Sequence, residues 1–155
     1  MMKNYKKILV AVDGSEQAEA AVKEAVVISK LSDAQLFILF ATDKMNLYAA
    51  AAPMPAVSAP AVPVVPAVPI VEEDLDEEAN DILNRATALI GNEAKYEEVR
   101  VDGSAKKEIV DFAKEHEIDL IVMGSSGKGA LDRMLLGSTA VSVVKHSPCS
   151  VMIIK

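Results

Sequence analysis

Residues Lys6–Asp13, with the sequence KKILVAVD, decide the fold because they form a β-branched apolar run without polar alternation. A strand with one solvated face alternates apolar and polar residues, whereas a strand covered on both faces of a parallel sheet is apolar throughout. Gly14 follows, and Ser15 then opens a segment whose apolar residues recur at helical spacing. The stretch therefore predicts a buried strand that leads directly into a helix.

The same unit recurs along the chain. Further strands are predicted at Ala34–Thr42, Tyr96–Asp102 (short and near an edge), Ile118–Gly124 and Ser150–Lys155, and further helices at Glu72–Ile90, Ala105–His116 (capped by Ser104) and Ser138 to about His146. This alternation predicts an α/β fold, a Rossmann-like open parallel five-stranded sheet with right-handed crossovers and helices on both faces. Ligands of such sheets bind at the carboxyl ends of the strands where the strand order reverses. Asp13 and Gly124 both lie at strand ends of this kind.

Composition limits the classes of function. The 155 residues indicate one domain, residues 1–155, and the net charge of −7 makes nucleic acid or an anionic membrane a poor partner. Cys149 is the single cysteine, so no internal disulfide can form, and we expect it to be a small core residue rather than a nucleophile. The apolar run Ile8–Val12 is too short for a signal-peptide core, which predicts a cytoplasmic protein.

The stretch Leu47–Val71 has no charged residue and holds six of the seven prolines. Each proline removes a helical hydrogen bond that hydrocarbon cannot replace, which argues against a membrane span. We interpret it as a polyproline-type excursion, a Pro/Ala-rich insertion at about residues 45–71. It is either a disordered spacer or an ordered arm that packs on a protein partner or covers the site.

A second unusual segment, GSSGKGALDRMLLGST, spans Gly124–Thr139 and holds four of the seven glycines. A Walker A loop needs Lys and then Ser or Thr after its second glycine, but Gly129 is followed by Ala130 and Leu131. A dinucleotide fingerprint needs a third glycine where this chain has Asp132, and it belongs after the first strand. It does fit G-x2-G-x9-G-[ST], with Gly124, Gly127, Gly137 and Ser138. Glycines at 127 and 129 permit an anion nest of backbone N–H groups, and Gly137 and Ser138 would start a helix whose N-terminus favours phosphate. The alternative is an ordinary strand-to-helix loop.

Three segments in order, KKILVAVDGSEQA, DLIVMGSSG and SPCSVMIIK, resemble the universal stress protein family. The resemblance covers the whole chain except the Pro/Ala-rich insertion. It implies the strand order 3-2-1-4-5. It also implies membership of the ATP-binding branch, in which the same glycine pattern holds phosphates and ribose. Some relatives lack the pattern and do not bind ATP.

Carried over residue by residue, the resemblance implies a nucleotide site. Its members are Ala11, Val12 and Asp13 at the end of the first strand, Ala41 as a small adenine contact, Met123, Gly124, Ser126, Gly127 and Lys128 at the first half of the loop, and Gly137, Ser138 and Thr139 at the second. Ser126 stands where relatives often have His or Arg, which implies a weaker phosphate contact. Lys128 and Arg133 could replace that contact, or they could be solvated loop charges.

Asp13 would repel a triphosphate unless a cation lay between them. Mg²⁺ (or Mn²⁺) commonly binds one or two carboxylates together with phosphates and water. Asp13 is therefore a candidate metal ligand, a ribose contact or a polar cap for the first helix. No His, Cys and carboxylate cluster has zinc spacing, and no catalytic residue is predicted. His116 and His146 are interpreted as surface groups at helix ends.

Three functions compete on this evidence. The first is an ATP-binding regulatory, stress-response module that acts as a homodimer. The second is an enzyme, either a slow ATPase or an ATP-dependent transferase, although no general base beyond Asp13 is evident. The third is a nucleotide-free interaction protein. With the strand order that the resemblance implies, the apolar strand Ser150–Lys155 would lie at a bare sheet edge, which is an aggregation hazard. The resemblance implies antiparallel pairing of this strand with its own copy in the dimer. The alternative is that the Pro/Ala-rich arm folds back and covers this edge.

Overall fold

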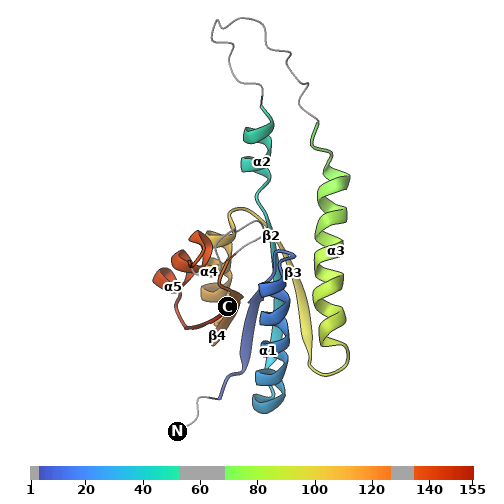
Figure 1. Cartoon of the computed structure of the whole chain (residues 1–155). Helices are drawn as coiled ribbons and strands as arrows, with labels where there is room; N and C mark the ends of the chain where they lie inside the picture. Colours follow the sequence, from blue (N-terminus) through green and yellow to red (C-terminus); the bar gives the residue numbers. More distant parts are fainter. Residues whose placement is uncertain (1–3, 53–68, 127–134) are drawn as a thin grey trace, which may run out of the picture.

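The computed structural model describes residues 4–52, 69–126 and 135–155. Its elements are β1 (Lys7–Ala11), α1 (Glu16–Ser32), β2 (Gln35–Thr42), α2 (Lys44–Ala51), α3 (Glu72–Ile90), β3 (Tyr96–Asp102), α4 (Ala105–Glu115), β4 (Leu120–Gly124), α5 (Ser138–His146) and β5 (Ser150–Ile154). The strands form one parallel sheet in the order β3-β2-β1-β4-β5. The predicted fold class and the implied strand order are both confirmed (Figure 1).

Strand β1 lies at the centre of the sheet and is buried on both faces, as its apolar run predicts. Ile8 pairs with Leu36 of β2 on one side and with Leu120 of β4 on the other. Ile8, Leu9 and Val10 are each 0% exposed. Full burial of one such side chain contributes about 1.5–3 kcal/mol. The central strand therefore holds both layers of the molecule together.

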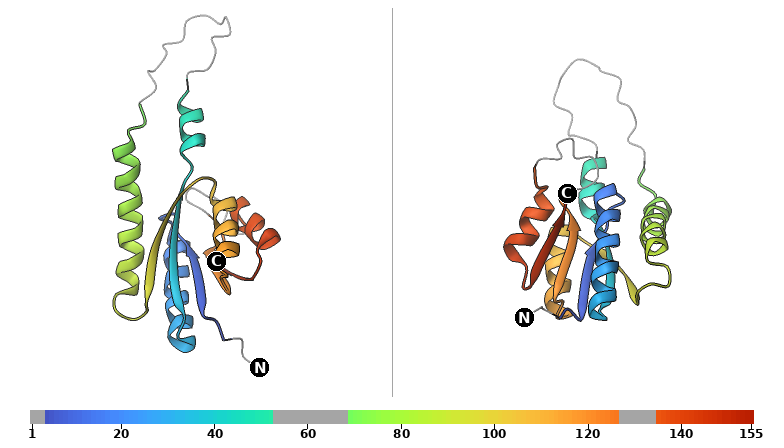
Figure 2. Two further views of the ribbon diagram at one scale, coloured as in Figure 1. Left: turned by 180° about the vertical axis from the view of Figure 1, so that it is seen from behind. Right: turned by 60° about the horizontal axis from the view of Figure 1, so that its bottom comes forward.

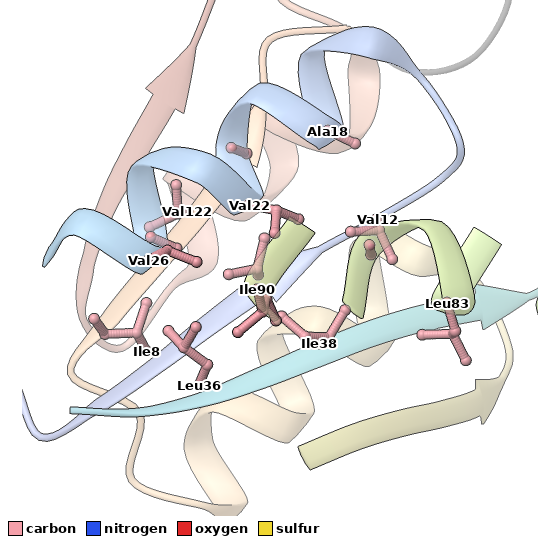
Figure 3. Packing of buried hydrophobic residues seen from close by; sticks show 14 of the residues in the cluster. Ile8, Val12, Ala18, Val22, Val26, Leu36, Ile38, Leu83, Ile90 and Val122 are labelled. Atoms are coloured by element: carbon pink, nitrogen blue, oxygen red, sulfur yellow. The ribbon is translucent and has the colours of Figure 1, made fainter. Parts of the chain in front are cut away.

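The two faces of the sheet are covered by different helices. Ile8 and Val10 point into a cluster with residues of α1 and α3, which Figure 3 shows from close by. Leu9 points the other way, into a cluster with residues of α4 and α5. Figure 2 shows α4 and α5 together on one side of the molecule, away from α3. Successive residues of a strand face opposite sides, so one apolar run supplies both cores.

Local signals fix most element ends. The Ser15 hydroxyl accepts a hydrogen bond from the Ala18 N–H at 3.1 Å and caps α1. Ser104 occupies the N-cap position of α4, as predicted, but its side chain makes no capping hydrogen bond. Strand β4 begins at Leu120 rather than Ile118, because the Ile118 N–H donates to the Ala113 carbonyl at 3.0 Å and closes the end of α4.

Helix α2 corrects one prediction. The polyproline-type excursion was expected from Leu47 onward, but Lys44–Ala51 is helical. Alanine is the strongest helix former, and the Asp43 carboxylate caps the helix by accepting from the Asn46 N–H at 3.1 Å. The helix ends before Pro53, because a residue that precedes proline disfavours helical backbone. The rest of the predicted excursion, residues 53–68, lies outside the described residues.

The acidic start of α3 is a solvated face, as its composition suggests. The carboxylate residues between Glu72 and Asp81 are all exposed, and the first buried residue of the helix is Ala79. In Figure 1 both α2 and the first turns of α3 extend beyond the carboxyl edge of the sheet. Within the described residues, no helix is long and apolar enough to cross a membrane.

Candidate functional site

A cavity of ≈ 420 Å³ opens at the carboxyl ends of β1 and β4, where the strand order reverses. This is the position that the topology predicts for a ligand. The starts of α1, α4 and α5 all contribute to its walls. The cavity is lined by Ala11, Val12, Asp13, Ser15, Ala18, Leu39, Ala41, Ala105, Ile109, Met123, Gly124, Ser125, Ser126, Gly137, Ser138, Thr139 and Ala140.

One part of the cavity is apolar. Leu39 of β2, Ile109 of α4 and Met123 of β4 are each at most 5% exposed and belong to the core cluster on the α4 and α5 face. Ala41 and Ala105 pack against the same cluster. These alanines are small, so they leave room between the strand ends and α4. An uncharged planar group is the kind of ligand that such a wall accommodates.

Another part of the cavity lining is formed by the start of α5, where backbone N–H groups are available. The Val141 N–H donates to the Gly137 carbonyl at 3.0 Å and closes the first turn. The N–H groups of Ser138, Thr139 and Ala140 have no backbone acceptor within the described residues. Free N–H groups and the helix dipole together favour an anion at this end.

Two buried serines stand beside these N–H groups. Ser125 is 4% exposed and Ser126 is 5% exposed, and both line the cavity. Neither hydroxyl has a hydrogen-bond partner among residues 4–52, 69–126 and 135–155. No fully buried side-chain N or O atom of the described residues lacks a partner, so these two hydroxyls are accessible from the cavity. They can bond water there or a polar ligand.

Asp13 lies at the cavity and caps the chain that enters α1. Its Oδ1 atom accepts a hydrogen bond from the Ser15 N–H at 2.9 Å. The N-cap of α1 is Ser15, so Asp13 holds the capping residue rather than a helical N–H, and its metal or ribose role stays a prediction. Within the described residues, no group of three or more His, Cys, Asp or Glu side chains could hold a metal ion. A cation at Asp13 would need phosphate oxygens and water as its other ligands.

Gly124 is required by packing as well as by its place in the glycine pattern. A Cβ atom at this position would lie 2.8 Å from Gln17 Cβ, 3.1 Å from Gln17 C and 3.2 Å from Ala18 N. The first turn of α1 therefore rests directly on the end of β4. This contact places Ser15 and Asp13, which precede α1, beside the end of β4 in the cavity lining.

The structure brings most of the predicted site residues together. Ten of them line the cavity: Ala11, Val12, Asp13, Ala41, Met123, Gly124, Ser126, Gly137, Ser138 and Thr139. Gly127 and Lys128 lie outside the described residues, as do Gly129 and Arg133.

Seven lining residues were not predicted: Ser15, Ala18, Leu39, Ala105, Ile109, Ser125 and Ala140. Two of them follow from periodicity. Leu39 lies two residues before Ala41 on the same face of β2, and Ile109 lies one helical turn after Ala105. No sequence pattern predicts Ser125 as a lining residue. It is held in place by backbone hydrogen bonds to Ile154 and Gly137, which almost any residue type could make.

The shifted pKa values of the described residues belong to surface pairs. A hydrogen bond from Lys30 lowers the pKa of Glu93, and one from Lys107 lowers the pKa of Asp111. The same bond, donated by Lys107 to the Asp111 carboxylate, raises the pKa of Lys107. These pairs are exposed and line none of the cavity.

Comparisons with known proteins identify the family. The model of the universal stress protein family matches residues 4–155. A universal stress protein of Methanocaldococcus jannaschii is 34% identical over 152 residues, 97% of this chain and 82% of that protein. The structure of universal stress protein UspA from Lactobacillus plantarum matches with a TM-score of 0.76 at 34% identity, over 99% of this chain and 100% of that one. The universal stress protein from Archaeoglobus fulgidus in complex with dAMP matches with a TM-score of 0.67 at 25% identity, over 99% and 100%. The chain therefore belongs to the universal stress protein family.

Proposed function

We propose that this universal stress protein is an ATP-binding regulatory module that holds the nucleotide in the cavity at the ends of β1 and β4. The observation that carries the proposal is the pairing of two unlike walls in one cavity. The apolar part, from β2, α4 and β4, lines the same cavity as the N–H groups at the start of α5 and the two buried serines that follow β4. A nucleotide has the same division between an uncharged base and anionic phosphates.

The relatives support an adenine nucleotide. One structure that matches over nearly the whole chain is a universal stress protein in complex with dAMP. In the present chain, Ala41 and Met123 would contact the base. Ser126 and the N–H groups of Ser138 and Thr139 would bind phosphate oxygens. Gly127 and Lys128 remain predicted members of the same site.

We favour ATP over a monophosphate as the ligand because Asp13 offers a place for a cation that bridges the carboxylate and the phosphates. The carboxylate lines the cavity and would repel phosphates close to it. Mg²⁺ or Mn²⁺ bound between Asp13 and the phosphates would remove this repulsion. The Oδ1 atom already accepts from the Ser15 N–H, which orients the carboxylate for such a role. A ribose contact by Asp13 is the alternative.

A regulatory role is favoured over catalysis. Asp13 is the one ionisable side chain among the described residues that line the cavity. Hydrolysis or group transfer needs a positioned general base and a means of activating the second reactant. At most weak hydrolysis is expected from a single carboxylate that also serves as a cap.

We further propose a homodimer through β5. This strand ends the sheet, and its residues Ser150–Ile154 are all partly exposed. The Ile154 carbonyl faces β4, since it accepts from the Ser125 N–H. Backbone groups alternate along a strand, so the N–H and C=O of Ile153 face the open edge. A second copy could pair with them across a two-fold axis.

The Pro/Ala-rich insertion is a candidate contact for a protein partner. Helix α2, which leads into it, has no buried residue and exposes Met45, Leu47 and Tyr48. Exposed apolar side chains on a projecting helix are more stable against a partner surface than in water. This contact would be the main function if the cavity proved to bind no nucleotide.

The decisive experiment is to denature the purified protein, analyse the released nucleotides by ion-exchange chromatography, and titrate ATP by calorimetry. Co-purified ATP supports the regulatory module, and ADP with multiple turnover supports an ATPase. An Ala41→Leu variant, which fills the apolar wall, should lose affinity, while Ala50→Leu on exposed α2 is the matched control. No bound nucleotide and no heat of binding would reject the proposal.

A further inference from the structure

Two backbone hydrogen bonds connect the outer strand β5 with the start of α5 through one residue. The Ser125 N–H donates to the Ile154 carbonyl at 2.8 Å. The Ser125 carbonyl accepts from the Gly137 N–H at 2.7 Å. Both bonds are short and shielded from water, because Ser125 is 4% exposed. The end of β5, the end of β4 and the N-cap of α5 are therefore joined in series.

This connection matters because α5 has few other restraints. The helix has nine residues, of which only Ala140 and Val143 are buried. A helix this short is marginal by itself, and its direction depends on tertiary contacts. The bond from Gly137 to Ser125 fixes the end of the helix that faces the cavity. It also uses the Gly137 N–H, so that the N–H groups of Ser138, Thr139 and Ala140 are the ones at this helix start without a backbone acceptor in the described part of the chain.

We propose that β5 is a positioning element of the ligand site. The Ile154 carbonyl holds Ser125, and the Ser125 carbonyl in turn holds Gly137 and aims the free N–H groups of α5 into the cavity. Ile154 contributes nothing to the cavity lining itself, so it acts through the backbone of its neighbours. The inference rests on the proposed function, since it names the part of the fold that tunes phosphate affinity.

The first test compares Gly137→Pro with Gly137→Ala. Gly137 has φ −64° and ψ 158°, a conformation that both proline and alanine adopt. Leu136 lies outside any helix, so proline interrupts none. Both variants add a Cβ atom, but only proline removes the N–H that binds the Ser125 carbonyl. We expect ATP affinity to fall about tenfold further in the proline variant than in the alanine variant, with the same circular dichroism.

The second test applies the same chemistry to β5. Ile154→Pro removes an N–H that faces β4 and disturbs the anchor of Ser125, whereas Ile153→Pro removes an N–H that faces the open edge. We expect Ile154→Pro to weaken ATP binding and Ile153→Pro to leave it within about twofold of the wild type. Equal affinities for the members of each pair would overturn the positioning role.

Amide hydrogen exchange separates this inference from the proposed function. The Gly137 amide should be protected in the ligand-free wild type, unprotected in Ile154→Pro and protected in Ile153→Pro. A wild type that binds no ATP but shows this pattern would reject the nucleotide and keep the positioning role. A wild type that binds ATP while its Gly137 amide exchanges freely would support the nucleotide and reject the positioning role.

Discussion

Replacing Gly124 by alanine should test how tightly α1 rests on the end of β4. The new Cβ would lie 2.8 Å from Gln17 Cβ and within 3.2 Å of two backbone atoms of α1. A Cβ contact of 2.8 Å requires its neighbour to shift, and Gln17 Cβ and the two backbone atoms cannot rotate away as a side-chain tip can. The first turn of α1 must therefore move, together with Ser15 and Asp13 at the cavity.

The size of the effect follows from this geometry. Adding a methyl group to a packed interior costs about 1–3 kcal/mol. We expect about 2 kcal/mol for Gly124→Ala, because helix backbone must shift rather than a free side chain. For this chain of 155 residues, that loss corresponds to a decrease of about 4–8 °C in Tm. ATP affinity should fall in parallel, since Asp13 and Ser15 move with the helix.

Urea unfolding and calorimetry on a double-mutant cycle would isolate the contact. Gln17→Gly removes the nearest atom and by itself costs up to about 1 kcal/mol of helix propensity. If the clash is real, the double variant should be more stable than the sum of the single effects by at least about 0.5 kcal/mol. Gly91→Ala is the control, because its Cβ meets no atom within 4 Å and only its φ of +53° opposes the change.

The reasoning would be refuted by single effects that add. Additivity within about 0.3 kcal/mol would mean that Gly124 and Gln17 do not compete for space. A Gly124→Ala protein with unchanged stability and ATP affinity would lead to the same conclusion. If Gly124→Ala lost ATP binding but kept the wild-type free energy of unfolding, Gly124 would act only as a ligand contact.

Three further predictions follow from the cavity, the sheet edge and the surface charges. Asp13→Asn should lose most of the Mg²⁺ dependence of ATP binding, and a wild-type affinity that EDTA leaves untouched would make Asp13 a ribose contact or a cap only. Ile153→Pro should convert a homodimer, about twice the 16.5 kDa chain, toward monomer by light scattering, and a wild-type monomer at micromolar concentration would reject β5 pairing. Lys107 lowers the pKa of Asp111, so this pair stabilises the fold above the unfolded pKa and loses its effect as the pH falls through the folded value. Lys107→Met should raise the Asp111 pKa measured by NMR, and an unchanged value would contradict the pairing.

The central strand was predictable because one physical rule governs it. An apolar run without alternation must be covered on both sides, and Ile8, Leu9 and Val10 are fully buried. The helix that follows was predictable from Ser15 and the apolar spacing. The sequence alone did not show which helix covers which face, because strands that alternate with helices permit several strand orders. The order came from the family resemblance and is confirmed in the structure.

Helix α2 was missed because its sequence has no amphipathic pattern. KMNLYAAA is helical through alanine propensity and the Asp43 cap, and none of it is buried. The nearby prolines dominated the interpretation of the whole segment. In β4 the error had the opposite origin, because Ile118 looks like a strand residue but its N–H closes α4. At β4 a backbone hydrogen bond decided the boundary, and residue types report such bonds poorly.

The candidate site also contains residues that the sequence indicated and residues that only tertiary contacts reveal. The family resemblance pointed to Asp13, Ala41, Gly124 and Gly137, and these residues line the cavity. Residue type was not sufficient for Ser125, whose importance comes from an N–H and a carbonyl that every residue except proline has. Gly124 was predicted for its place in the glycine pattern, but the contact with Gln17 is a tertiary fact. Sequence reasoning therefore found ten residues of the cavity lining, while it missed the backbone contacts that hold the lining in place.

The cavity itself follows from the order of the strands. Strand β1 leads to β2 through α1 on one face, and β4 leads away to β5 through α5 on the other face. Right-handed crossovers in opposite directions must place their helices on opposite faces, so a gap remains above two adjacent strand ends. Topology thus creates the space, while Ala41 and Ala105 keep one side of it open. Larger residues there should close the base side without disturbing the sheet, which makes ligand choice separable from the fold.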